Sequence, residues 1–533
     1  MTEKRIIYKN GNIFTADEEK PFAQSMAVEK GRIVWIGEEK DRPAMEGEEI
    51  DLQGTCVIPG FIDAHMHPVM LADFSKKISA LPPRVYSIED LVEEIRACRE
   101  KQGPGKWCQG WGYDEGKFAE KRSINRHDLD RGCSDSPVSI IRTCGHIRCV
   151  NSKALELAGI DRNTPDPVGG QIERDEKGEP TGVLKETARN LVLPFMPVEE
   201  KEETIENLVD LGKLLSSQGI VAVSDMGNLD SSDNFPLYQE AIQRGFRQRV
   251  GIYYMWDYFM DNPDFSIPME RRDRKNQIFA AGLKLIGDGS VSGKTAWMEE
   301  PYLGDEQSRG ISVCTQEQLE SALDFCRKNH CQLSFHAMGT RAIARIVERV
   351  DKEEPWTKEE IPFLRVEHVT QPSEDSIERA AKKGIAFVTQ PIFLYAEIES
   401  YLKNLGKERI KACYPIKHML KKGVKLSFST DAPATSWAVP SDPFPCIKGA
   451  VTRKAFDGTD CGEKEAIDIE TAVKLYTREA ARTAGFSDLG QLKEGYLADF
   501  VLLDRDIFTV PSEEIDQIKV MATYIEGDCV YQR

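Results

Sequence analysis

The sequence predicts an α/β protein: a (β/α)8 TIM barrel with a small β-sandwich domain built from both termini and an inserted subdomain after the first barrel strand. Three observations predict this fold. Eight short apolar runs alternate with amphipathic stretches of helix length, both ends of the chain are strand-like, and about 150 residues separate the first run from the second. Strands that alternate with helices indicate βαβ units and a parallel sheet, and eight such units close into a barrel.

The two ends of the chain predict one composite domain of short strands. Near the N-terminus, Arg5–Tyr8 precedes Asn10-Gly11, a hairpin-type turn. Near the C-terminus, Ala498–Asp504 and Val520–Gly527 are also strand-like. Because neither end could bury a core alone, we expect residues 1–57 and 487–533 to form one β domain, and residues 58–486 to form the barrel with its insertion.

The barrel strands are expected at the apolar runs. These are Val57–His65, Gly219–Met226, Arg249–Trp256, Gly282–Gly287, Gln332–His336, Phe363–His368, Ile385–Gln390 and Val424–Ser429. Helical patterns separate most of them, at Thr315–Asn329, Arg341–Asp351, Ser373–Lys383 and Arg409–Lys422. A plain βα unit is far shorter than the first gap, so residues from about 69 to 200 are interpreted as an inserted subdomain over the catalytic face.

Composition excludes some classes of protein. The net charge of −18 over 533 residues argues against a protein that follows a nucleic-acid backbone, which needs a basic footprint. No apolar run approaches the ~18 residues of a membrane span, and the N-terminus lacks a signal region. The 13 cysteines are scattered, which favours free thiols in a reducing compartment. We therefore expect a cytoplasmic protein without nucleic-acid or membrane partners.

The first apolar run ends in the triplet His65-Met66-His67. Residues i and i+2 of a strand share a face, so the two imidazoles are expected to project together. Paired neutral imidazoles suit a divalent transition metal such as zinc. Taken alone, the triplet is equally compatible with a chance pair in a turn, although the chain has only eight histidines.

Four more polar residues follow or lie within later runs of the predicted barrel. They are Lys284, His336, His368 and Asp431. Each has an ordinary structural explanation: a packed histidine, a lysine that extends its amine to the surface, or a turn aspartate. Catalytic groups of such barrels, however, lie at the carboxyl ends of the strands. Their joint occurrence at separate strand ends predicts a metal site.

The order His-x-His, Lys, His, His, Asp at strands one, four, five, six and eight resembles the amidohydrolase superfamily. The segments Val57–His67, Thr430–Pro433 and Gly495–Asp499 share this resemblance. A finer match resembles the branch that includes N-substituted formamide deformylases. It depends on Gly110–Gly112, Gly145-His146 with Asn151-Ser152, Gly182–Glu186, Asp288–Ser290 with Thr295-Ala296, and His336–Gly339.

The resemblance implies a divalent metal site, with zinc expected as one or two ions. Its implied ligands are His65, His67, His336, His368 and Asp431. In binuclear members the strand-four lysine is carboxylated and bridges both metals, and Lys284 occupies that position. The alternative is one metal held by His65, His67, His336 and Asp431, with unmodified Lys284 nearby. Asp431 would act as general base and then general acid, while His368 would bind the second metal or stabilise the oxyanion.

Substrate contacts are predicted at Trp111, Asp114, His146 and Trp297. Large aromatic residues are more often core, but Gly110-Trp111-Gly112 is a flexible setting for a core position. His146 follows an apolar stretch and resembles a strand-end residue. One departure stands out: the branch commonly carries aspartate after His-Ala-x-Gly, where this chain has Thr340. Such a change could alter ligand orientation, so it weakens assignment of the substrate by analogy.

The strand-end residues and the resemblance together predict an enzyme that hydrolyses a non-peptide carbon–nitrogen bond of a small molecule, such as an N-acyl, N-formyl or cyclic amide, with metal-activated water. Two alternatives use the same metal site: hydrolytic deamination, and decarboxylation or isomerisation. A non-enzymatic binding protein is a third, but such a protein has no need to keep Asp431. The resemblance also suggests a homodimer.

Overall fold

The computed structural model describes residues 5–143, 147–227, 232–262, 264–358 and 360–533. The chain divides into two compact units. The first comprises Met1–Val69, Leu208–Thr435 and Ser441–Arg533, and the second comprises Met70–Asn207 and Ser436–Pro440. The first unit contains every residue predicted to bind metal.

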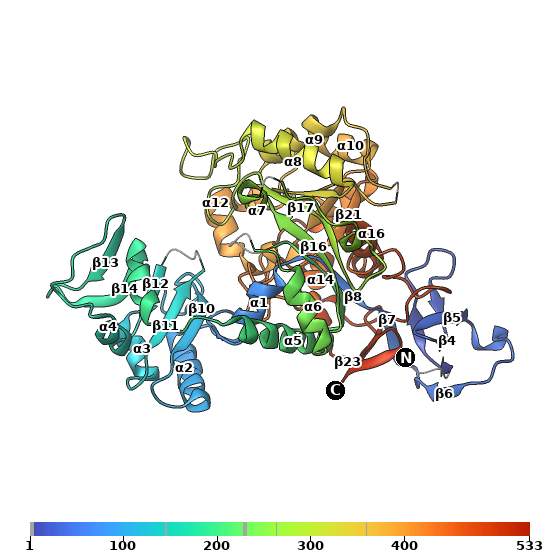
Figure 1. Cartoon of the computed structure of the whole chain (residues 1–533), viewed down its shortest axis with the longest axis horizontal. Helices are drawn as coiled ribbons and strands as arrows, with labels where there is room; N and C mark the ends of the chain where they lie inside the picture. The colour runs from blue at the N-terminus through green and yellow to red at the C-terminus, as the bar shows by residue number, and fades with distance from the viewer. Residues whose placement is uncertain (1–4, 144–146, 228–231, 263, 359) are drawn as a thin grey trace. The chain divides into compact units, whose positions relative to one another are not determined.

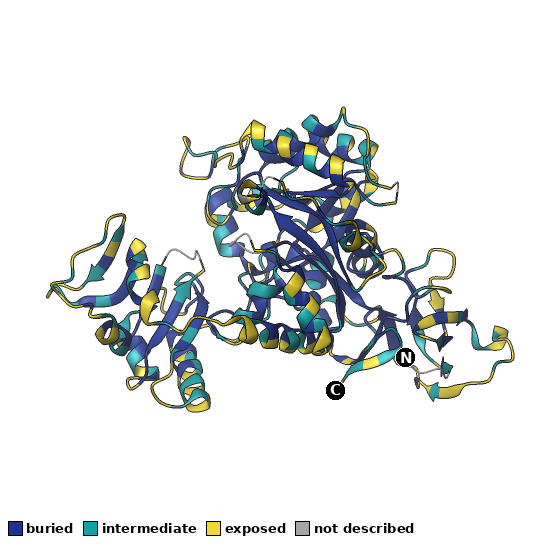
Figure 2. Cartoon of the chain, in the orientation of Figure 1, coloured by how far each residue is buried: buried dark blue, intermediate teal, exposed yellow. Residues whose placement is uncertain are grey.

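An eight-stranded parallel sheet forms the centre of the first unit, with the strands in chain order. The strands are β8 (Phe61–Met66), β15 (Ile220–Asp225), β16 (Arg249–Met255), β17 (Ile278–Ile286), β18 (Gln332–Ala337), β19 (Leu364–His368), β20 (Ala386–Thr389) and β21 (Lys425–Phe428). Helices surround them (Figure 1). The strands are almost wholly buried, whereas the helices expose their outer faces (Figure 2), as a parallel sheet covered by helices requires. The predicted barrel fold is confirmed.

Hydrogen bonds tie the carboxyl end of β8 to the segment that follows β21. The amide of Asp431 donates to the carbonyl of His65 at 2.8 Å, and the amide of His67 donates to the carbonyl of Ala432 at 2.8 Å. The Thr430 hydroxyl donates to the Asp63 carboxylate at 2.5 Å. These bonds bring the first and last strands of the barrel together at the end where the predicted ligands lie.

Some helices of the first unit begin or end at recognisable caps. Thr315 and Gln318 form a capping box at the start of α8, and Ser373 caps α10, which ends at left-handed Gly384. The helices are α5 (Lys201–Ser217, which also extends into the second unit), α6 (Phe235–Gln243), α7 (Trp256–Asp261), α8 (Gln316–Asn329), α9 (Thr340–Val350), α10 (Glu374–Lys383), α11 (Pro391–Ala396), α12 (Ile398–Ile410), α13 (Ile416–Lys421), α14 (Pro443–Thr452), α15 (Ile469–Leu475) and α16 (Arg478–Ala484).

One predicted helix is wrong. The stretch Arg409–Lys422 was expected to be continuous, but α12 ends at Ile410 and α13 begins at Ile416. Pro415 lies between them and cannot donate a helical hydrogen bond. Tyr414 has φ of 50°, outside the right-handed helical region. The amphipathic pattern continued across a turn that the proline should have indicated.

The chain ends form two further sheets. One contains β1 (Ile6–Lys9), β4 (Ser25–Glu29), β5 (Arg32–Gly37) and β6 (Glu48–Asp51); the other contains β2 (Asn12–Phe14), β3 (Phe22–Ala23), β7 (Cys56–Pro59), β22 (Phe500–Leu503), β23 (Val520–Ile525) and β24 (Asp528–Gln532). The two sheets share one apolar core, in which Tyr8 packs edge-on against Phe500. Strands from both termini therefore build one sandwich.

The first predicted barrel strand is two strands. Gly60 divides the run Val57–His65 into β7, which pairs in the terminal sandwich, and β8, which pairs in the barrel. A Cβ atom at Gly60 would lie 2.4 Å from Cγ1 of Val221. Only glycine allows the chain to pass from one sheet to the other this close to Val221.

The second unit is built around a six-stranded mixed sheet with a separate apolar cluster on each face. Its strands are β9 (Ile78–Ser79), β10 (Cys108–Tyr113), β11 (Val138–Arg142), β12 (Ile147–Val150), β13 (Gly170–Arg174) and β14 (Pro180–Glu186). Its helices are α1 (Pro68–Phe74, which starts in the first unit), α2 (Ile88–Gln102), α3 (Arg126–Gly132) and α4 (Ser152–Ala158).

Within the described ranges, every helix is too short or too polar to cross a membrane. The predicted domain limits, at residues 57/58 and 486/487, stay predictions.

Candidate metal centre

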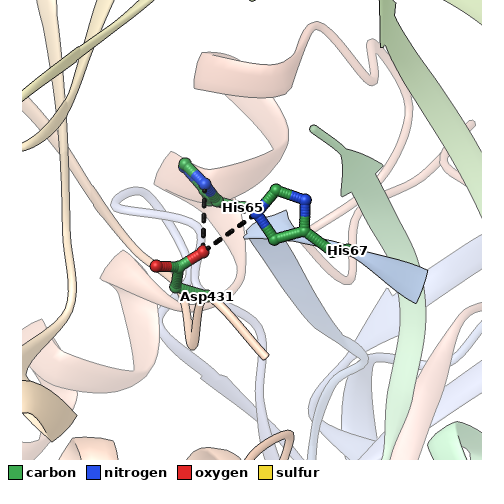
Figure 3. Close-up of side chains that lie close together, drawn as sticks. All are labelled: His65, His67 and Asp431. Carbon is green, nitrogen blue, oxygen red and sulfur yellow. Dashed lines mark ion pairs between the residues drawn. The ribbon is translucent and has the colours of Figure 1, made fainter. Parts of the chain in front are cut away.

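His65, His67 and Asp431 meet at the carboxyl end of the barrel. Nε2 of His65 lies 3.2 Å from Oδ1 of Asp431, and Nε2 of His67 lies 3.3 Å from the same oxygen (Figure 3). The ligating atoms of these three residues all lie within 4.8 Å of one another. His65 is 1% exposed and Asp431 is 7% exposed, so water screens this cluster poorly.

The hydrogen bonds on the far side of each imidazole define which ring nitrogen faces Asp431. Nδ1 of His65 lies 2.7 Å from the Glu367 carboxylate, and Nδ1 of His67 lies 2.7 Å from the Gly227 carbonyl. Both partners only accept, so both Nδ1 atoms donate. In the neutral tautomers, the two Nε2 lone pairs then point at an anionic oxygen. Three acceptors facing one another are stable only with a cation or a proton between them.

The charge around His67 agrees with this requirement. Burial lowers the pKa of His67, but its hydrogen bond to Asp431 and the charge of that carboxylate outweigh burial, so the pKa is raised overall. Burial raises the pKa of Asp431, yet the charge of His65 and the bonds from both histidines hold it well below its usual range. The cluster therefore attracts positive charge.

His336 and His368 lie beside this group. The ring centroids of His65 and His368 are 4.9 Å apart, and those of His368 and His336 are 4.3 Å apart. Nδ1 of His368 bonds the Gln390 side chain at 2.9 Å, and Nε2 of His336 bonds the Gly289 carbonyl at 3.1 Å. One ring nitrogen is left on each: Nε2 of His368 and Nδ1 of His336.

Both imidazoles are neutral at ordinary pH. Burial, and then the charge of Lys284, lowers the pKa of His336 to about 3. Burial, and then the charge of His336, lowers the pKa of His368 well below its usual value. Neutral imidazole is the form that binds metal.

Two of these side chains depend on unusual backbone. His368 has φ of 74° and Val369 has φ of 49°, while Asp431 has φ of 59°. Non-glycine residues seldom adopt positive φ, and such residues cluster at functional sites. In β19, Arg365 and Glu367 share one face, and His368 would lie on the other by alternation. The positive φ values end that alternation at the position where His368 meets His65.

Lys284 lies in β17 and is 2% exposed. Its Nζ has no hydrogen-bond partner among the residues that the structure describes. Burial lowers its pKa to about 8, a shift that the charges of Glu367 and Asp431 oppose. A buried amine without a partner is costly, so this position is unexplained by packing alone.

Asp288 fixes the loop after β17 against the loop after β18. Its carboxylate accepts hydrogen bonds from the amides of Trp297, Met338 and Gly339, at 2.8 to 3.0 Å. Burial raises its pKa to about 7, although these three bonds lower it. The same loop supplies the Gly289 carbonyl that orients His336. The Asp288–Ser290 motif therefore has a structural role beside the site.

The residues predicted to contact substrate lie in different settings. Trp111 is buried in the second unit with Leu81 and Ala438, and its ring lies 5.1 Å from Phe74. Asp114, also in the second unit, accepts a hydrogen bond from the Gly116 amide. Trp297 lies in the first unit and lines a surface hollow along α9 with Arg341 and Arg345. His146 falls outside the described residues. All four stay predictions.

The sequence reasoning missed the residues that hold the imidazoles. Glu367 bonds His65, and Arg365 donates to Glu367 at 2.5 Å; both are 0% exposed. A usable signal was present, since two charged residues with strand spacing interrupt an apolar run. Gln390 and the carbonyl of Gly227 gave no comparable signal, because either could equally belong to an ordinary loop.

Comparison with known proteins gives matches along the whole chain. The model described as "Amidohydrolase family" matches residues 48–531. The YtcJ protein of Bacillus subtilis (strain 168) is 31% identical over 546 residues, covering 99% of this chain and 100% of that protein. The N-substituted formamide deformylase of Arthrobacter pascens is 27% identical over 554 residues, covering 100% and 99%.

A solved structure supports the same assignment. An uncharacterized metal-dependent hydrolase from Pyrococcus horikoshii OT3 matches with a TM-score of 0.74 and 25% identity, covering 96% of this chain and 99% of that one. The predicted class, a metal-dependent hydrolase of non-peptide carbon–nitrogen bonds in small molecules, is confirmed at the level of the family. With its barrel, its histidine cluster and these matches, the chain belongs to the amidohydrolase family.

Proposed function

We propose that this amidohydrolase holds zinc as a binuclear centre and cleaves an N-acyl, N-formyl or cyclic amide bond of a small molecule. The observation that carries the proposal is the approach of His65 Nε2 and His67 Nε2 to one oxygen of Asp431, at 3.2 and 3.3 Å. Nitrogen and carboxylate ligands in this geometry suit zinc. The named activity of the Arthrobacter relative supports the choice of substrate class.

The six predicted ligands divide between two metal positions. His65, His67 and Asp431 would hold the first ion; Nδ1 of His336 and Nε2 of His368 would hold the second. Lys284 would bridge them as a carbamate. Its buried Nζ, with a pKa of about 8, supplies the neutral amine that attacks carbon dioxide. The new N–C bond would form with loss of one proton from nitrogen. The resulting carbamate would carry its anionic oxygens at the end of the Lys284 side chain.

The chain's own residues would handle the protons. A divalent metal supplies Lewis-acid polarisation of the carbonyl and lowers the pKa of water. Asp431 would accept the proton of the attacking water and return it to the leaving nitrogen. Its carboxylate is ionised: burial raises its pKa, but the charge of His65 and the bonds from both histidines outweigh burial and hold the pKa well below its usual range. His368 would hold the second ion. Trp111, Asp114, His146 and Trp297 are proposed to contact substrate.

A substrate screen tests this function directly. Metal-depleted and zinc-loaded protein would be incubated with panels of N-formyl, N-acyl and cyclic amides, with products detected by mass spectrometry. We expect turnover of one panel by the zinc-loaded protein alone, and two equivalents of zinc per chain. Protein that binds no zinc or manganese would refute the metal site. Loaded protein that only deaminates an aromatic amine would replace the amidase assignment with hydrolytic deamination.

A further inference from the structure

Two buried charged residues in β19 lie directly behind the metal centre. Arg365 and Glu367 are both 0% exposed. Arg365 donates to Glu367 from Nε at 2.5 Å and from Nη2 at 3.1 Å. It also donates to the Tyr253 hydroxyl at 3.1 Å and to the carbonyl of Ala64. A buried ion pair often stabilises a protein no better than apolar residues of similar volume would. Stability alone therefore does not explain why this pair is buried here.

Among the described residues, four hydrogen bonds converge on the Glu367 carboxylate. Oε1 accepts from Ser334 Oγ at 2.8 Å and from Arg365 Nε, while Oε2 accepts from His65 Nδ1 at 2.7 Å and from Arg365 Nη2. Arg365 can only donate, and it donates to both carboxylate oxygens. The arrangement therefore favours the ionised form.

We propose that Glu367, held in place by Arg365, is the positioning residue that prepares His65 for the first metal ion. Glu367 accepts a hydrogen bond from the Nδ1–H group and fixes the ring plane, which turns the lone pair of Nε2 toward Asp431. Arg365 fixes the carboxylate from the opposite side. The inference rests on the proposed metal site and deepens it. It assigns to Glu367 and Arg365 the control of affinity for the first metal ion.

The other imidazoles show why this role is specific to Glu367. In the described part of the chain, His67 and His336 bond backbone carbonyls and His368 bonds the amide of Gln390. These acceptors are neutral, whereas the acceptor behind His65, on the side of the ring away from Asp431, is the Glu367 carboxylate. A carboxylate behind an imidazole raises its basicity as a ligand. His65 is therefore expected to be the strongest of the four nitrogen ligands. If its ring is no longer held in place, the affinity for the first ion should fall more than the affinity for the second.

The test compares Glu367→Gln with Ser334→Ala in metal-depleted full-length protein. Both variants remove a hydrogen bond of the same buried network, but Ser334 does not contact an imidazole. Zinc affinity would be measured by competition with a chelator, and the melting temperature would be measured without metal. We expect Glu367→Gln to weaken the first zinc equivalent about 10- to 100-fold, while Ser334→Ala lowers the melting temperature and leaves zinc affinity unchanged.

Cobalt substitution provides a readout that general destabilisation would not change. The visible spectrum of Co²⁺ depends on ligand orientation, so it should shift in Glu367→Gln and stay constant in Ser334→Ala. Glu367→Asp keeps an ionised acceptor and should recover part of the affinity. If Glu367→Gln does not fold, the double variant R365M/E367L removes both charges together and should fold with weak zinc binding.

The outcomes separate this inference from the proposed function. Wild-type protein that binds no zinc would refute the metal site itself. Wild-type protein that binds zinc, beside a folded Glu367→Gln or double variant with the same affinity and cobalt spectrum, would overturn the positioning role alone.

Discussion

The two halves of the histidine cluster are built differently. In the first half, formed by β8 and the segment after β21, two imidazoles approach one carboxylate, and an ionised acceptor lies behind His65. In the second half, formed by β18 and β19, His336 and His368 face each other with neutral acceptors behind both. The first half carries negative charge of its own. The second half lacks negative charge unless Lys284 is carboxylated. The two positions should therefore differ in their affinity for metal.

The largest expected effect is on catalysis in the first half. Asp431→Asn keeps an oxygen ligand but cannot take up a proton, so kcat should fall about 100- to 10,000-fold while zinc stays bound. Steady-state kinetics and metal analysis would measure this. Asp468→Asn is a matched control, because Asp468 caps α15 and asparagine caps equally well. Retained turnover in Asp431→Asn would refute the proton-transfer role.

The next effect concerns the second half alone. Lys284→Met removes the amine that would form the carbamate, so the zinc content should fall from two equivalents to one, because only the half with Asp431 retains its ligands. Metal analysis after dialysis would measure the content. Lys425→Met is the control, since Lys425 is an exposed lysine on β21. Two equivalents in Lys284→Met would exclude the bridging role. One equivalent in both the wild-type protein and Lys284→Met would establish the mononuclear alternative.

A pH dependence should separate the halves further. With a pKa of about 8, the Lys284 amine is about one tenth neutral at pH 7 and about nine tenths neutral at pH 9. Uptake of the second zinc equivalent, in metal-depleted protein given bicarbonate, should therefore rise between these values. The first equivalent should change less. A second equivalent that binds equally at both pH values, or that shows the same rise in Lys284→Met, would contradict the role of this amine.

The same shift links pH to stability. In the unfolded chain Lys284 holds its proton up to the ordinary pKa of 10.5, whereas the folded protein releases it near 8. Between these values the unfolded state binds more protons, so this group makes the free energy of unfolding of the metal-free protein increase with pH. Denaturant melts from pH 8 to 10 should show a smaller increase in Lys284→Met.

The smallest expected effect is on the orientation of His368. Gln390→Met removes the neutral acceptor behind this ring, and one net hydrogen bond corresponds to about a twofold to tenfold change in affinity. The loss should fall on the second zinc equivalent, as measured by chelator competition. Ser429→Ala, which removes the partner of the Gln390 amide, should change it less. A loss confined to the first equivalent would show that the two halves are not independent.

Much of the fold could be predicted from periodicity. The alternation of apolar runs and amphipathic stretches is a local property, and the eight strands follow it, from β8 to β21. One error arose where a tertiary contact overrode the local pattern: Gly60 divides an unbroken apolar run because Val221 approaches it. The other was a local signal overlooked, since Pro415 interrupts a helical pattern.

The sequence by itself determined the barrel and the residue types at its strand ends. Strand ends of a parallel barrel meet on one face, so one shared site could be predicted from position for six residues. They are His65, His67, Lys284, His336, His368 and Asp431. Only the tertiary structure decided which ring nitrogen of each histidine is free, and that Glu367 and Arg365 lie behind His65. Those features depend on hydrogen bonds between residues as far as 302 positions apart in the chain. No local pattern encodes such a distance, because it is fixed only when the barrel closes.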